Sequence, residues 1–451
     1  MKVSVVGLGK LGSPLAAVLA SKGHKVIGVD VNAEYVRLLA SGKAPVQEPQ
    51  LQEFIDAGKG HLKATTSFEE AVLGSDIAFI IVPTPSDKNG VFTNKNVLAA
   101  IHEIGKALRK KNSYYIVNII STVMPGSTGG EIREALEKSS GKRVGTDLGL
   151  CYNPEFIALG SVIKDLLNPD FILIGESDPR AGDMLEAIYK TSCDNTPRMA
   201  RMNFVNAELT KISVNTYVTT KISYANMLSE ICDRLPSADV NVVTSAIGLD
   251  SRIGTKYLKG ATAYGGPCFP RDNVAFGVLA ESIGARPDIA RATDEINRYQ
   301  ADRVVEIIRR HAAPGSTVGV LGLSYKPDTS VIEESPGVAI ALRLAAAGYT
   351  VRVHDPMALD AARAVLGDKA TATESIEQCT RGAAVLVIAT AWPQFAAIDP
   401  AMLGGSAGRP VVIDCWRMIS KDRIGAAADV VYLGYGDHHL AESRDRKKRA
   451  S

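Results

Sequence analysis

The chain of 451 residues has little net charge, few cysteines and no long apolar run. A formal net charge of +2 gives no reason to expect nucleic acid or membrane partners. The six cysteines are scattered without a CxxC pair, which argues against a zinc site or a disulfide framework and suits a reducing compartment. No apolar run could span a bilayer, and residues 1–6 lack the length and cleavage site of a signal peptide. We therefore expect a cytoplasmic protein without a bound metal.

Length and composition indicate a soluble globular protein of several domains. A chain of 451 residues is long for one hydrophobic core, so two or three domains are expected. Apolar residues make up 46% and charged residues 22%, which is ordinary for a soluble protein. The end of the sequence, 441–451, is basic and almost free of apolar residues, and we expect it to be disordered.

A glycine motif follows the first predicted strand, Lys2 to Val6, and reads Gly7-Leu8-Gly9-Lys10-Leu11-Gly12. A helical pattern and a second predicted strand come next, and that strand ends at Asp30, 23 residues after Gly7. Glycines in this context let backbone N–H groups approach a pyrophosphate at a helix N-terminus. Asp30 would accept hydrogen bonds from ribose hydroxyls and repel a 2′-phosphate, which favours NAD over NADP. The alternative, a glycine-rich turn without a ligand, fits this strand–turn–helix context poorly.

Polar residues follow three further predicted strands, 77–82, 115–120 and 150–152. Ligands of an open parallel sheet bind at the carboxyl ends of its strands. Thr84 and Thr122 are therefore candidates to line the nicotinamide side, although each alone could equally be a helix cap. Glu155 follows the third strand in the sequence Asn153-Pro-Glu-Phe156, where its position argues against an ordinary surface glutamate.

A long helix is predicted from Ala207 to about Arg234, since this stretch contains neither glycine nor proline. Lys211 and Asn215 are four residues apart and so share one face of it. Such a pair is often part of a solvated stripe. Here the neighbouring residues are apolar nearly all round the helix, which predicts burial, and a buried lysine needs a partner or a task.

Cys268 stands in the segment 264–273, Tyr-Gly-Gly-Pro-Cys-Phe-Pro-Arg-Asp-Asn. Helical spacing of the following apolar residues predicts a helix that begins near Asp272. A thiol just before a helix N-terminus and three residues from Arg271 lies in a field that favours the thiolate. The preceding glycines leave room for another group to approach. The alternative is a half-buried structural cysteine with Asp272 as a helix cap.

A second α/β pattern begins after Pro314-Gly315, with strands predicted at 317–323, 350–354, 384–389 and 411–415 and a helix at 338–346. The loop after its first strand, Ser324 to Thr329, has no GxGxxG motif, so a second dinucleotide site of the same kind is not expected. Lys326 in this loop could meet a phosphate. Arg417 is the only arginine at a strand end in this part of the chain.

An NAD domain combined with a reactive cysteine fits oxidation of an alcohol to an acid. A thiolate adds to an aldehyde to form a thiohemiacetal, and oxidation of that adduct gives a thioester that water can hydrolyse. The oxyanions formed on the way need a donor, and Lys211 with Asn215 could provide it.

The motifs GLGKLG, PTP, STV, NPEF, ELTKISVN, SRIGTKYL, GGPCFPRD and GLSYKPDT occur in this order over nearly the whole chain. In this respect the chain resembles nucleotide-sugar dehydrogenases of the UDP-glucose/GDP-mannose dehydrogenase family. The resemblance implies an α/β fold with a Rossmann-like NAD domain at 1–200. It also implies a central long-helix dimerisation region at 201–300 and a Rossmann-like UDP-sugar domain at 301–440.

The resemblance also implies the roles of individual residues. It implies Cys268 as the nucleophile, and its catalytic set would be Cys268, Lys211, Asn215, Asp272, Thr122 and Glu155. Cofactor contacts would come from Gly7, Gly9, Lys10, Leu11, Gly12, Asp30, Thr84, Thr122, Glu155 and Arg271. Substrate contacts would come from Glu155, Phe156, Ile157, Lys211, Asn215, Arg252, Tyr257, Leu258, Gly265, Lys326 and Arg417, with Arg252 reaching the site of a partner subunit.

Three departures from the family pattern bear on cofactor affinity and sugar preference. Leu159 stands where many relatives have a second glutamate, Glu333 where an arginine often follows the KPDT loop, and Arg271 where a lysine is common. UDP-glucose is the favoured substrate, and GDP-mannose or a UDP-N-acetylhexosamine is the alternative. A two-electron β-hydroxyacid dehydrogenase would lack the cysteine loop and the third domain. A non-catalytic NAD sensor would have no need of Cys268, Lys211 and Asn215 together.

Overall fold

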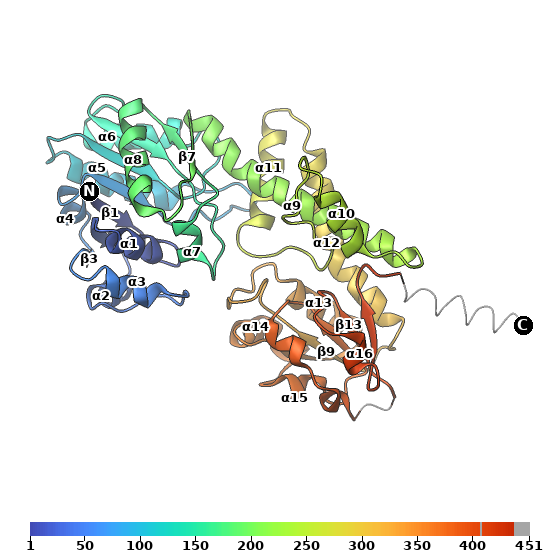
Figure 1. The fold of residues 1–451 in the computed structure, drawn as a ribbon. Coiled ribbons are helices and arrows are strands. Elements are labelled where there is room, and N and C mark those ends of the chain that lie inside the picture. The colour runs from blue at the N-terminus through green and yellow to red at the C-terminus, as the bar shows by residue number, and fades with distance from the viewer. Residues whose placement is uncertain (406–407, 437–451) are drawn as a thin grey trace, which may run out of the picture. The chain divides into compact units, whose positions relative to one another are not determined.

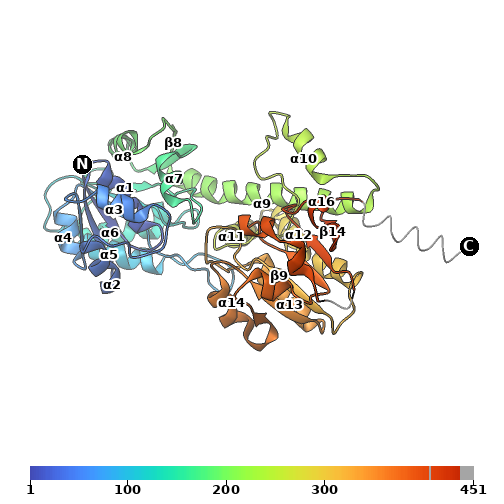
Figure 2. The ribbon, with the colours of Figure 1, turned by 60° about the horizontal axis from the view of Figure 1, so that its bottom comes forward.

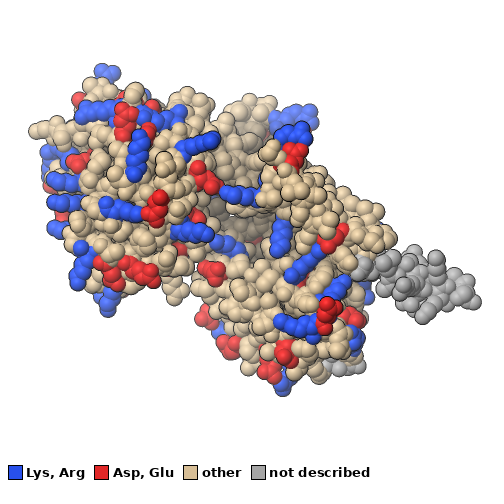
Figure 3. Space-filling view, viewed as in Figure 1, with Lys and Arg blue, Asp and Glu red and all other residues tan. Residues whose placement is uncertain are grey.

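The computed structural model describes residues 1–405 and 408–436, and the chain divides into two compact units, Met1–Ser213 and Val214–Ser451. Each unit has a β-sheet with helices packed on it (Figure 1). The predicted tail, 441–451, lies outside the described residues. Positive and negative side chains are interspersed on the face shown in Figure 3, in keeping with the small net charge. Among the described residues, no helix is both long and apolar enough to cross a membrane.

The first unit carries an eight-stranded sheet in the order β3-β2-β1-β4-β5-β6-β7-β8. Every neighbouring pair is parallel except β6 with β7. Its strands are β1 (Lys2–Val6), β2 (Lys25–Val29), β3 (Leu62–Thr65), β4 (Ile77–Ile80), β5 (Tyr115–Ile119), β6 (Leu148–Tyr152), β7 (Phe171–Glu176) and β8 (Arg198–Met202). The order of the first strands, with β1 between β2 and β4, confirms the predicted Rossmann-like arrangement.

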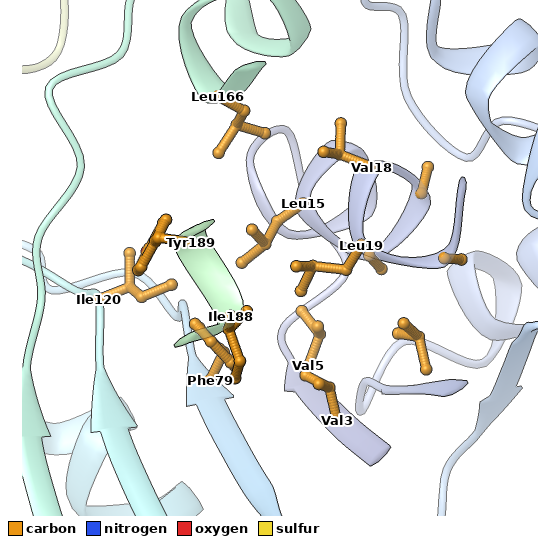
Figure 4. Close-up of a cluster of buried hydrophobic side chains, with 14 of the residues drawn as sticks. Val3, Val5, Leu15, Val18, Leu19, Phe79, Ile120, Leu166, Ile188 and Tyr189 are labelled. Carbon is orange, nitrogen blue, oxygen red and sulfur yellow. The ribbon is translucent and has the colours of Figure 1, made fainter. Parts of the chain in front are cut away.

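Helices connect these strands and cover both faces of the sheet. They are α1 (Gly12–Ser21), α2 (Ala33–Ala40), α3 (Leu51–Ala57), α4 (Phe68–Leu73), α5 (Lys95–Leu108), the π-helix η1 (Thr128–Ile132), α6 (Arg133–Ser140), α7 (Val162–Leu167) and α8 (Pro179–Ser192). Alternate residues of a strand enter different cores, as in β4, where Phe79 packs with α1 and α8 and Ile80 packs with α5. Figure 4 shows the first of these cores, with Leu15 and Leu19 of α1 above Val3 and Val5 of β1.

A long helix, α9 (Phe204–Arg234), continues from the first unit into the second (Figure 2). Its 31 residues span about 46 Å. It begins three residues before the predicted start at Ala207. The predicted burial of α9 is confirmed for Lys211, which is 6% exposed. It fails on another side of the helix, where Tyr217, Tyr224 and Ile231 are between 45% and 65% exposed. An apolar helix therefore has one uncovered side in the single chain.

The rest of the central region is helical, with α10 (Val240–Gly248), α11 (Phe269–Ser282) and α12 (Asp288–Arg309). The predicted start of α11 near Asp272 is wrong, because the helix begins at Phe269 and Cys268 occupies the N-cap position. Proline is tolerated in the first helical turn, so Pro270 does not delay the start. Asp272 consequently lies in the first turn and does not cap the helix.

The second unit carries a six-stranded parallel sheet in the order β11-β10-β9-β12-β13-β14. Its strands are β9 (Thr317–Leu321), β10 (Thr350–His354), β11 (Thr371–Ala372), β12 (Val385–Ile388), β13 (Val411–Asp414) and β14 (Asp429–Tyr432). The connecting helices are α13 (Pro336–Ala346), α14 (Leu359–Leu366), α15 (Ile376–Thr380), α16 (Lys421–Ile424) and the 3-10 helices η2 (Gly367–Lys369), η3 (Pro393–Ala397) and η4 (Pro400–Leu403). The second Rossmann-like arrangement is therefore also confirmed.

Candidate active site

The glycine turn after β1 is shaped by two different requirements. Gly7 has a φ of +99°, and a Cβ on Gly12 would lie 1.8 Å from the carbonyl oxygen of Gly7. These two glycines are needed for the turn to pack against the start of α1. By contrast, a Cβ on Gly9 would meet no protein atom within 4 Å. Packing of the chain does not explain a glycine there, whereas close approach of a ligand to the backbone does.

The N-terminus of α1 suits the pyrophosphate of a dinucleotide, and the carboxylate of Asp30 suits the hydroxyls of the ribose attached to it. No side chain caps α1, and the Gly12 N–H at its start can meet an anion. Ser13 N donates to the Gly9 carbonyl oxygen at 3.1 Å, and Pro14 has no N–H. Asp30 is partly exposed and accepts hydrogen bonds from the backbone N–H groups of Leu8 and Asn32 at 2.6 and 2.7 Å. A carboxylate has about four lone-pair sites, so two remain for ribose hydroxyls. Lys10 is exposed beside the turn and Leu11 is partly buried.

Thr84 and Thr122 are brought together at the ends of β4 and β5. The Thr84 hydroxyl donates to the Thr122 carbonyl oxygen at 2.7 Å, so Thr84 fixes the backbone that carries the Thr122 side chain. Glu208 of α9 holds the same loop further along, because its buried carboxylate accepts from Gly126 N and Thr128 N at 2.6 and 2.7 Å. Sequence reasoning missed Glu208, since no local pattern joins it to a loop some 80 residues earlier.

Glu155 lies after β6 in a partly buried position. Burial raises the pKa of Glu155 to about 7, while hydrogen bonding from Tyr189 and the charge of Lys211 oppose that rise. Lys211 is buried, and its Nζ donates to the Glu155 carbonyl oxygen at 2.7 Å and lies 4.5 Å from the centre of the Phe156 ring. The first unit therefore brings Lys211 and the Glu155 loop together. A glutamate with a pKa near neutrality can act as an acid or a base.

Two other residues of this loop, Ile157 and Leu159, are partly buried and pack against the core next to α1. Leu159 stands where many relatives have a second glutamate, and here its side chain adds apolar contact without a charge. Sequence reasoning also missed Tyr189 of α8, whose hydroxyl lies 3.0 Å from Glu155 Oε1.

In the second unit, Cys268 is exposed at the N-terminus of α11. The helix has 14 residues, and the positive end of its dipole stabilises negative charge on the thiol sulfur. Of the six cysteines, Cys268 is the exposed one, while Cys193 is partly buried and the rest are buried. Cys268 is thus well placed for covalent chemistry.

Asp272 and Asn215 form a buried pair beneath the first turn of α11. Asn215 Nδ2 donates to Asp272 Oδ2 at 2.6 Å, and both side chains are less than 9% exposed. Arg271 Nε lies 3.6 Å from Asp272 Oδ1 and gives the carboxylate a positive neighbour. The second unit therefore brings together Asn215, Asp272 and Cys268, since the Asp272 N–H donates to the Cys268 carbonyl oxygen at 2.8 Å.

The glycines before Cys268 were expected to leave room for another group, and the groups that approach are parts of the chain itself. A Cβ on Gly265 would lie 2.3 Å from the Glu334 carbonyl oxygen, and one on Gly266 would lie 2.6 Å from the Tyr325 ring. Gly266 N also donates to the Glu333 carbonyl oxygen at 2.8 Å. The loop after β9, which contains Lys326, is therefore packed directly against the cysteine loop.

Three other predicted substrate residues lie on the segment between α10 and α11. Tyr257 is about half exposed, with a φ of +63° and its ring 6.2 Å from that of Phe269, and Leu258 is buried. Arg252 has a side chain that is 86% exposed, and it pairs with Asp250 in the same turn at 2.6 Å. Glu333, at the position where an arginine is common, has an exposed side chain.

Arg417 is engaged within the protein. Its Nη1 donates to Asp239 Oδ1 at 2.6 Å, and its Nη2 donates to the carbonyl oxygens of Leu433 and Gly434 at 3.4 and 3.0 Å. These contacts tie the end of β13 to the start of α10 and the end of β14. Contact between Arg417 and a substrate stays a prediction.

Comparison with known proteins agrees with this arrangement. Three models of the UDP-glucose/GDP-mannose dehydrogenase family match the chain: the NAD binding domain at 1–193, the central domain at 205–299 and the UDP binding domain at 319–421. The chain belongs to the UDP-glucose/GDP-mannose dehydrogenase family. It is therefore an NAD-dependent dehydrogenase of nucleotide sugars, and the predicted resemblance and cofactor are confirmed.

Individual relatives match over most of the chain. The chain is 34% identical over 425 residues to the UDP-glucose 6-dehydrogenase of Haloferax volcanii, covering 93% of this chain and 98% of the relative. It is 34% identical over 359 residues to the GDP-mannose 6-dehydrogenase of Pseudomonas aeruginosa, covering 79% and 81%. The solved structure of a UDP-glucose dehydrogenase from Pyrobaculum islandicum is 35% identical with a TM-score of 0.88, covering 96% of this chain and 98% of that one.

Proposed function

We propose that this dehydrogenase oxidises the C6 hydroxyl of UDP-glucose to a carboxylate, using two molecules of NAD for each sugar nucleotide. The observation that carries the proposal is Cys268, exposed at the N-terminus of α11 with Asn215 and Asp272 paired directly below it. A two-electron dehydrogenase has no use for a poised thiol, whereas an aldehyde must add a nucleophile before it can be oxidised further.

In the first oxidation the alcohol carbon would give up a hydride, and NAD held by the glycine turn and Asp30 would supply the hydride acceptor. The substrate oxygen becomes negative as its proton leaves, and Lys211 and Asn215 donate to it. Asp272 keeps the Asn215 amide in one orientation through its 2.6 Å hydrogen bond, so that amide is preorganised for donation. Thr122, held by Thr84, lines the cofactor side.

In the second oxidation Cys268 Sγ adds to the aldehyde carbon and gives a thiohemiacetal. Transfer of a hydride to a second NAD, with release of the hydroxyl proton to solvent, would convert this adduct to a thioester. Water would then cleave the carbon–sulfur bond to release the acid and the thiol. We assign activation of that water to Glu155, whose pKa near neutrality lets it take the proton of the water and later release it. Lys211 donates to the oxyanion in each of these steps.

The nucleotide end of the substrate would be held by the second unit. Tyr257, Leu258, Gly265 and Lys326 lie on the two loops that pack against each other beside Cys268. A lysine can meet phosphate as a point charge. Binding of a nucleotide to the loop of Lys326 would thereby also order the loop of Cys268.

A UDP sugar is favoured over a GDP sugar by the extent of the matches. At the same identity of 34%, the match to the UDP-glucose enzyme covers 93% of the chain and the match to the GDP-mannose enzyme covers 79%. The family model that matches 319–421 is described as UDP binding. GDP-mannose remains the second candidate because of that 34% relative. Solved structures of dehydrogenases for N-acetylated sugars are 22% to 24% identical and support the fold alone.

The test is an assay of NADH formation with UDP-glucose, GDP-mannose and UDP-N-acetylhexosamines, combined with mass spectrometry of the product. We expect two NADH for each UDP-glucose consumed and a uronic acid as product. A single NADH with a stable aldehyde or ketone would disprove the four-electron reaction, and a preference for GDP-mannose would replace the substrate.

We also propose that the enzyme is a homodimer formed through α9. Large apolar side chains exposed by 37% to 65% recur at helical spacing from the middle of α9 to the residue just after its end: Tyr217, Tyr224, Met227, Ile231 and Leu235. Such a contiguous apolar stripe on a soluble protein is typical of an interface. Ile231→Glu should yield monomers in light scattering, whereas Val365→Glu, at an exposed site on α14, should not. Dimers of unchanged stability in Ile231→Glu would contradict this interface.

Arg252 offers a functional test of the dimer. If it reaches the site of the partner subunit, mixing inactive Arg252→Ala and Cys268→Ser subunits should restore part of the activity. Full activity of Arg252→Ala alone would refute this role. We further propose a cytoplasmic location, because a reducing compartment keeps the Cys268 thiol available as a nucleophile.

A further inference from the structure

Glu155 is one end of a buried chain of polar side chains that continues through Tyr189 to Asn153. Tyr189 of α8 has its hydroxyl 3.0 Å from Glu155 Oε1 and also in short contact with Asn153 Oδ1. Tyr189 and Asn153 are 5% and 1% exposed, so water does not replace these contacts. The hydroxyl therefore lies between two possible acceptors.

The orientation of the Asn153 amide is fixed by the main chain. Its Nδ2 donates to the carbonyl oxygen of Leu173 in β7 at 2.8 Å, so its Oδ1 must face Tyr189. The same oxygen accepts from Asn118 Nδ2 at 3.3 Å. Reversing the amide would place two oxygens against each other at Leu173. Asn153 thus presents an acceptor, and never a donor, to Tyr189.

One hydroxyl proton cannot serve both acceptors. When the carboxyl of Glu155 is protonated, it donates to the Tyr189 oxygen and Tyr189 donates to Asn153, so every contact is satisfied. When Glu155 is ionised, Tyr189 must turn its proton to the carboxylate and Asn153 loses it. Burial raises the pKa of Tyr189 well above its ordinary value, so the hydroxyl keeps its proton in both states.

Other groups face Glu155 and act in parallel with this chain. Lys211 of α9 is the nearby positive charge and favours the carboxylate. Cys193, at the end of α8, is protonated near neutrality because burial raises the pKa of its thiol to about 11. Among these groups, Tyr189 is the one that donates to the carboxylate itself.

We propose that Tyr189, oriented by Asn153, is a positioning residue that sets the protonation state of Glu155 by turning one hydroxyl proton between two acceptors. Asn153 competes with Glu155 for that proton. The functional consequence, timing of water activation by Glu155, rests on the proposed role of Glu155 in hydrolysis. The proton competition itself depends only on these contacts.

This competition predicts that two variants shift the pKa of Glu155 in opposite directions. Tyr189→Phe removes the donor to the carboxylate and should raise the pKa of Glu155 by about one pH unit, as expected for a hydrogen bond to a charged group. Asn153→Leu removes the competing acceptor at similar volume and should lower that pKa. A merely structural role would shift both in the same direction or neither.

The titration of Glu155 can be followed directly by infrared difference spectroscopy of the whole enzyme. The carboxyl band is assigned by its absence in Glu155→Gln. Tyr115→Phe is the matched control, because Tyr115 is a buried tyrosine of the same unit that bonds to Ser4 and Ser75. It should leave the Glu155 titration unchanged. If Asn153→Leu does not fold, Asn118→Leu tests the same oxygen, since loss of its second donor should raise the pKa of Glu155.

Opposite shifts in Tyr189→Phe and Asn153→Leu, followed by the acid limb of the pH–rate profile for acid release, would support the proposal. No shift in Tyr189→Phe, or equal shifts in Tyr189→Phe and Tyr115→Phe, would overturn it. If the shifts occur and Glu155→Gln still releases acid at the wild-type rate, the proton competition stands and the hydrolytic role of Glu155 is refuted.

Discussion

The two sheets of this chain begin with the same turn. Gly7 N donates to Val29 O at 2.8 Å after β1, and Gly322 N donates to His354 O at 2.9 Å after β9. Both glycines have a φ of +99°. A Cβ on Gly12 would lie 1.8 Å from the oxygen of Gly7, and one on Gly337 would lie 1.9 Å from the oxygen of Gly322. The close contact between turn and helix is thus present in both sheets.

The two sheets differ in the length of the segment between the paired glycines and in the surroundings of the aspartate after the second strand. The paired glycines are five positions apart in the first sheet and fifteen apart in the second. Asp30 accepts two backbone hydrogen bonds and is partly exposed, whereas Asp355, the acid after β10, is 2% exposed. Its carboxylate accepts from backbone or side-chain groups of Leu323, Ser324, Met357, Ala358 and Trp392. The first acid has capacity left for a ribose, and the second has none.

This comparison teaches that the strand order and the glycine contact provide a scaffold, while binding depends on unsatisfied groups at the strand ends. The Trp392 indole N–H donates to Asp355 at 3.1 Å, as a ribose hydroxyl would donate to Asp30. We therefore assign the cofactor to the first sheet and not to the second. In the proposed mechanism, covalent chemistry falls to Cys268 at the N-terminus of α11, outside both sheets.

The largest effect on activity is expected from a substitution outside both sheets, at Cys268. Cys268→Ser should abolish normal acid release, because the aldehyde no longer forms a thioester, while slow aldehyde formation or a stalled ester remains. Affinities for NAD and for UDP, measured by calorimetry, should stay within twofold of wild type. Acid formation at the wild-type rate would show that the nucleophile is another residue.

Lys211→Ala is the matched variant on α9, and it should slow every step. Removing one oxyanion donor typically costs about 10²–10³-fold in rate. Oxidation of supplied aldehyde should therefore also fall by this factor, measured in single turnovers after circular dichroism has shown a folded protein. Normal rates in both oxidations would exclude Lys211 as the shared donor.

Gly9→Val should break cofactor binding on the first sheet without disturbing its packing. Open space around the position predicts an unchanged melting temperature and a KM for NAD raised at least about tenfold, equivalent to about 1.4 kcal/mol. Gly12→Val is the control, because its side chain would collide with Gly7 and should lower stability first. A normal KM in a folded Gly9→Val enzyme would mean that the pyrophosphate lies elsewhere.

Much of this comparison was predictable from local patterns. The strands that precede Gly7 and Asp30, and the missing GxGxxG motif after β9, follow from short apolar runs and glycine spacing. The contact of Gly322 with Gly337 was not predictable, because the intervening loop hides it. It was also not predictable that all acceptor sites of the Asp355 carboxylate are occupied, because one of its donors is the indole of Trp392, which follows β12.

The residues of the candidate site also fall into those that local patterns predict and those that they do not. Cys268, Lys211 and Asn215 could be singled out because their spacing and flanking residues carry a chemical meaning. Tyr189 and Glu208 could not, since each looks like an ordinary helical residue in the sequence and acquires its role from a loop distant in sequence. The start of α11 at Phe269 was missed because the prediction rested on the helical spacing of apolar residues that begins only after Asp272.

A matched pair of aspartate variants would test the two acids directly. Asp30→Asn should raise the KM for NAD with little change in stability. Asp355→Asn should leave that KM unchanged but lower the free energy of unfolding by about 2–3 kcal/mol, because an amide cannot accept all the donors around it. Urea denaturation and NAD kinetics of both variants separate these outcomes. A stability loss in Asp30→Asn equal to that in Asp355→Asn would erase the difference between the sheets.

The smallest effect is expected in the pH dependence of stability, and it comes from the strand end that bears Glu155. Its folded-state pKa of about 7 lies above the ordinary value of 4.5. The contribution of its protonated form is fully present below pH 4.5 and is lost as the pH rises through about 7. Glu155→Gln, which resembles the protonated form, should lose less stability than wild type between pH 5 and pH 8, by about 1–2 kcal/mol after allowance for partial exposure. Urea denaturation at both pH values measures this, and parallel curves for the two proteins would show that the carboxyl titrates as in the unfolded chain.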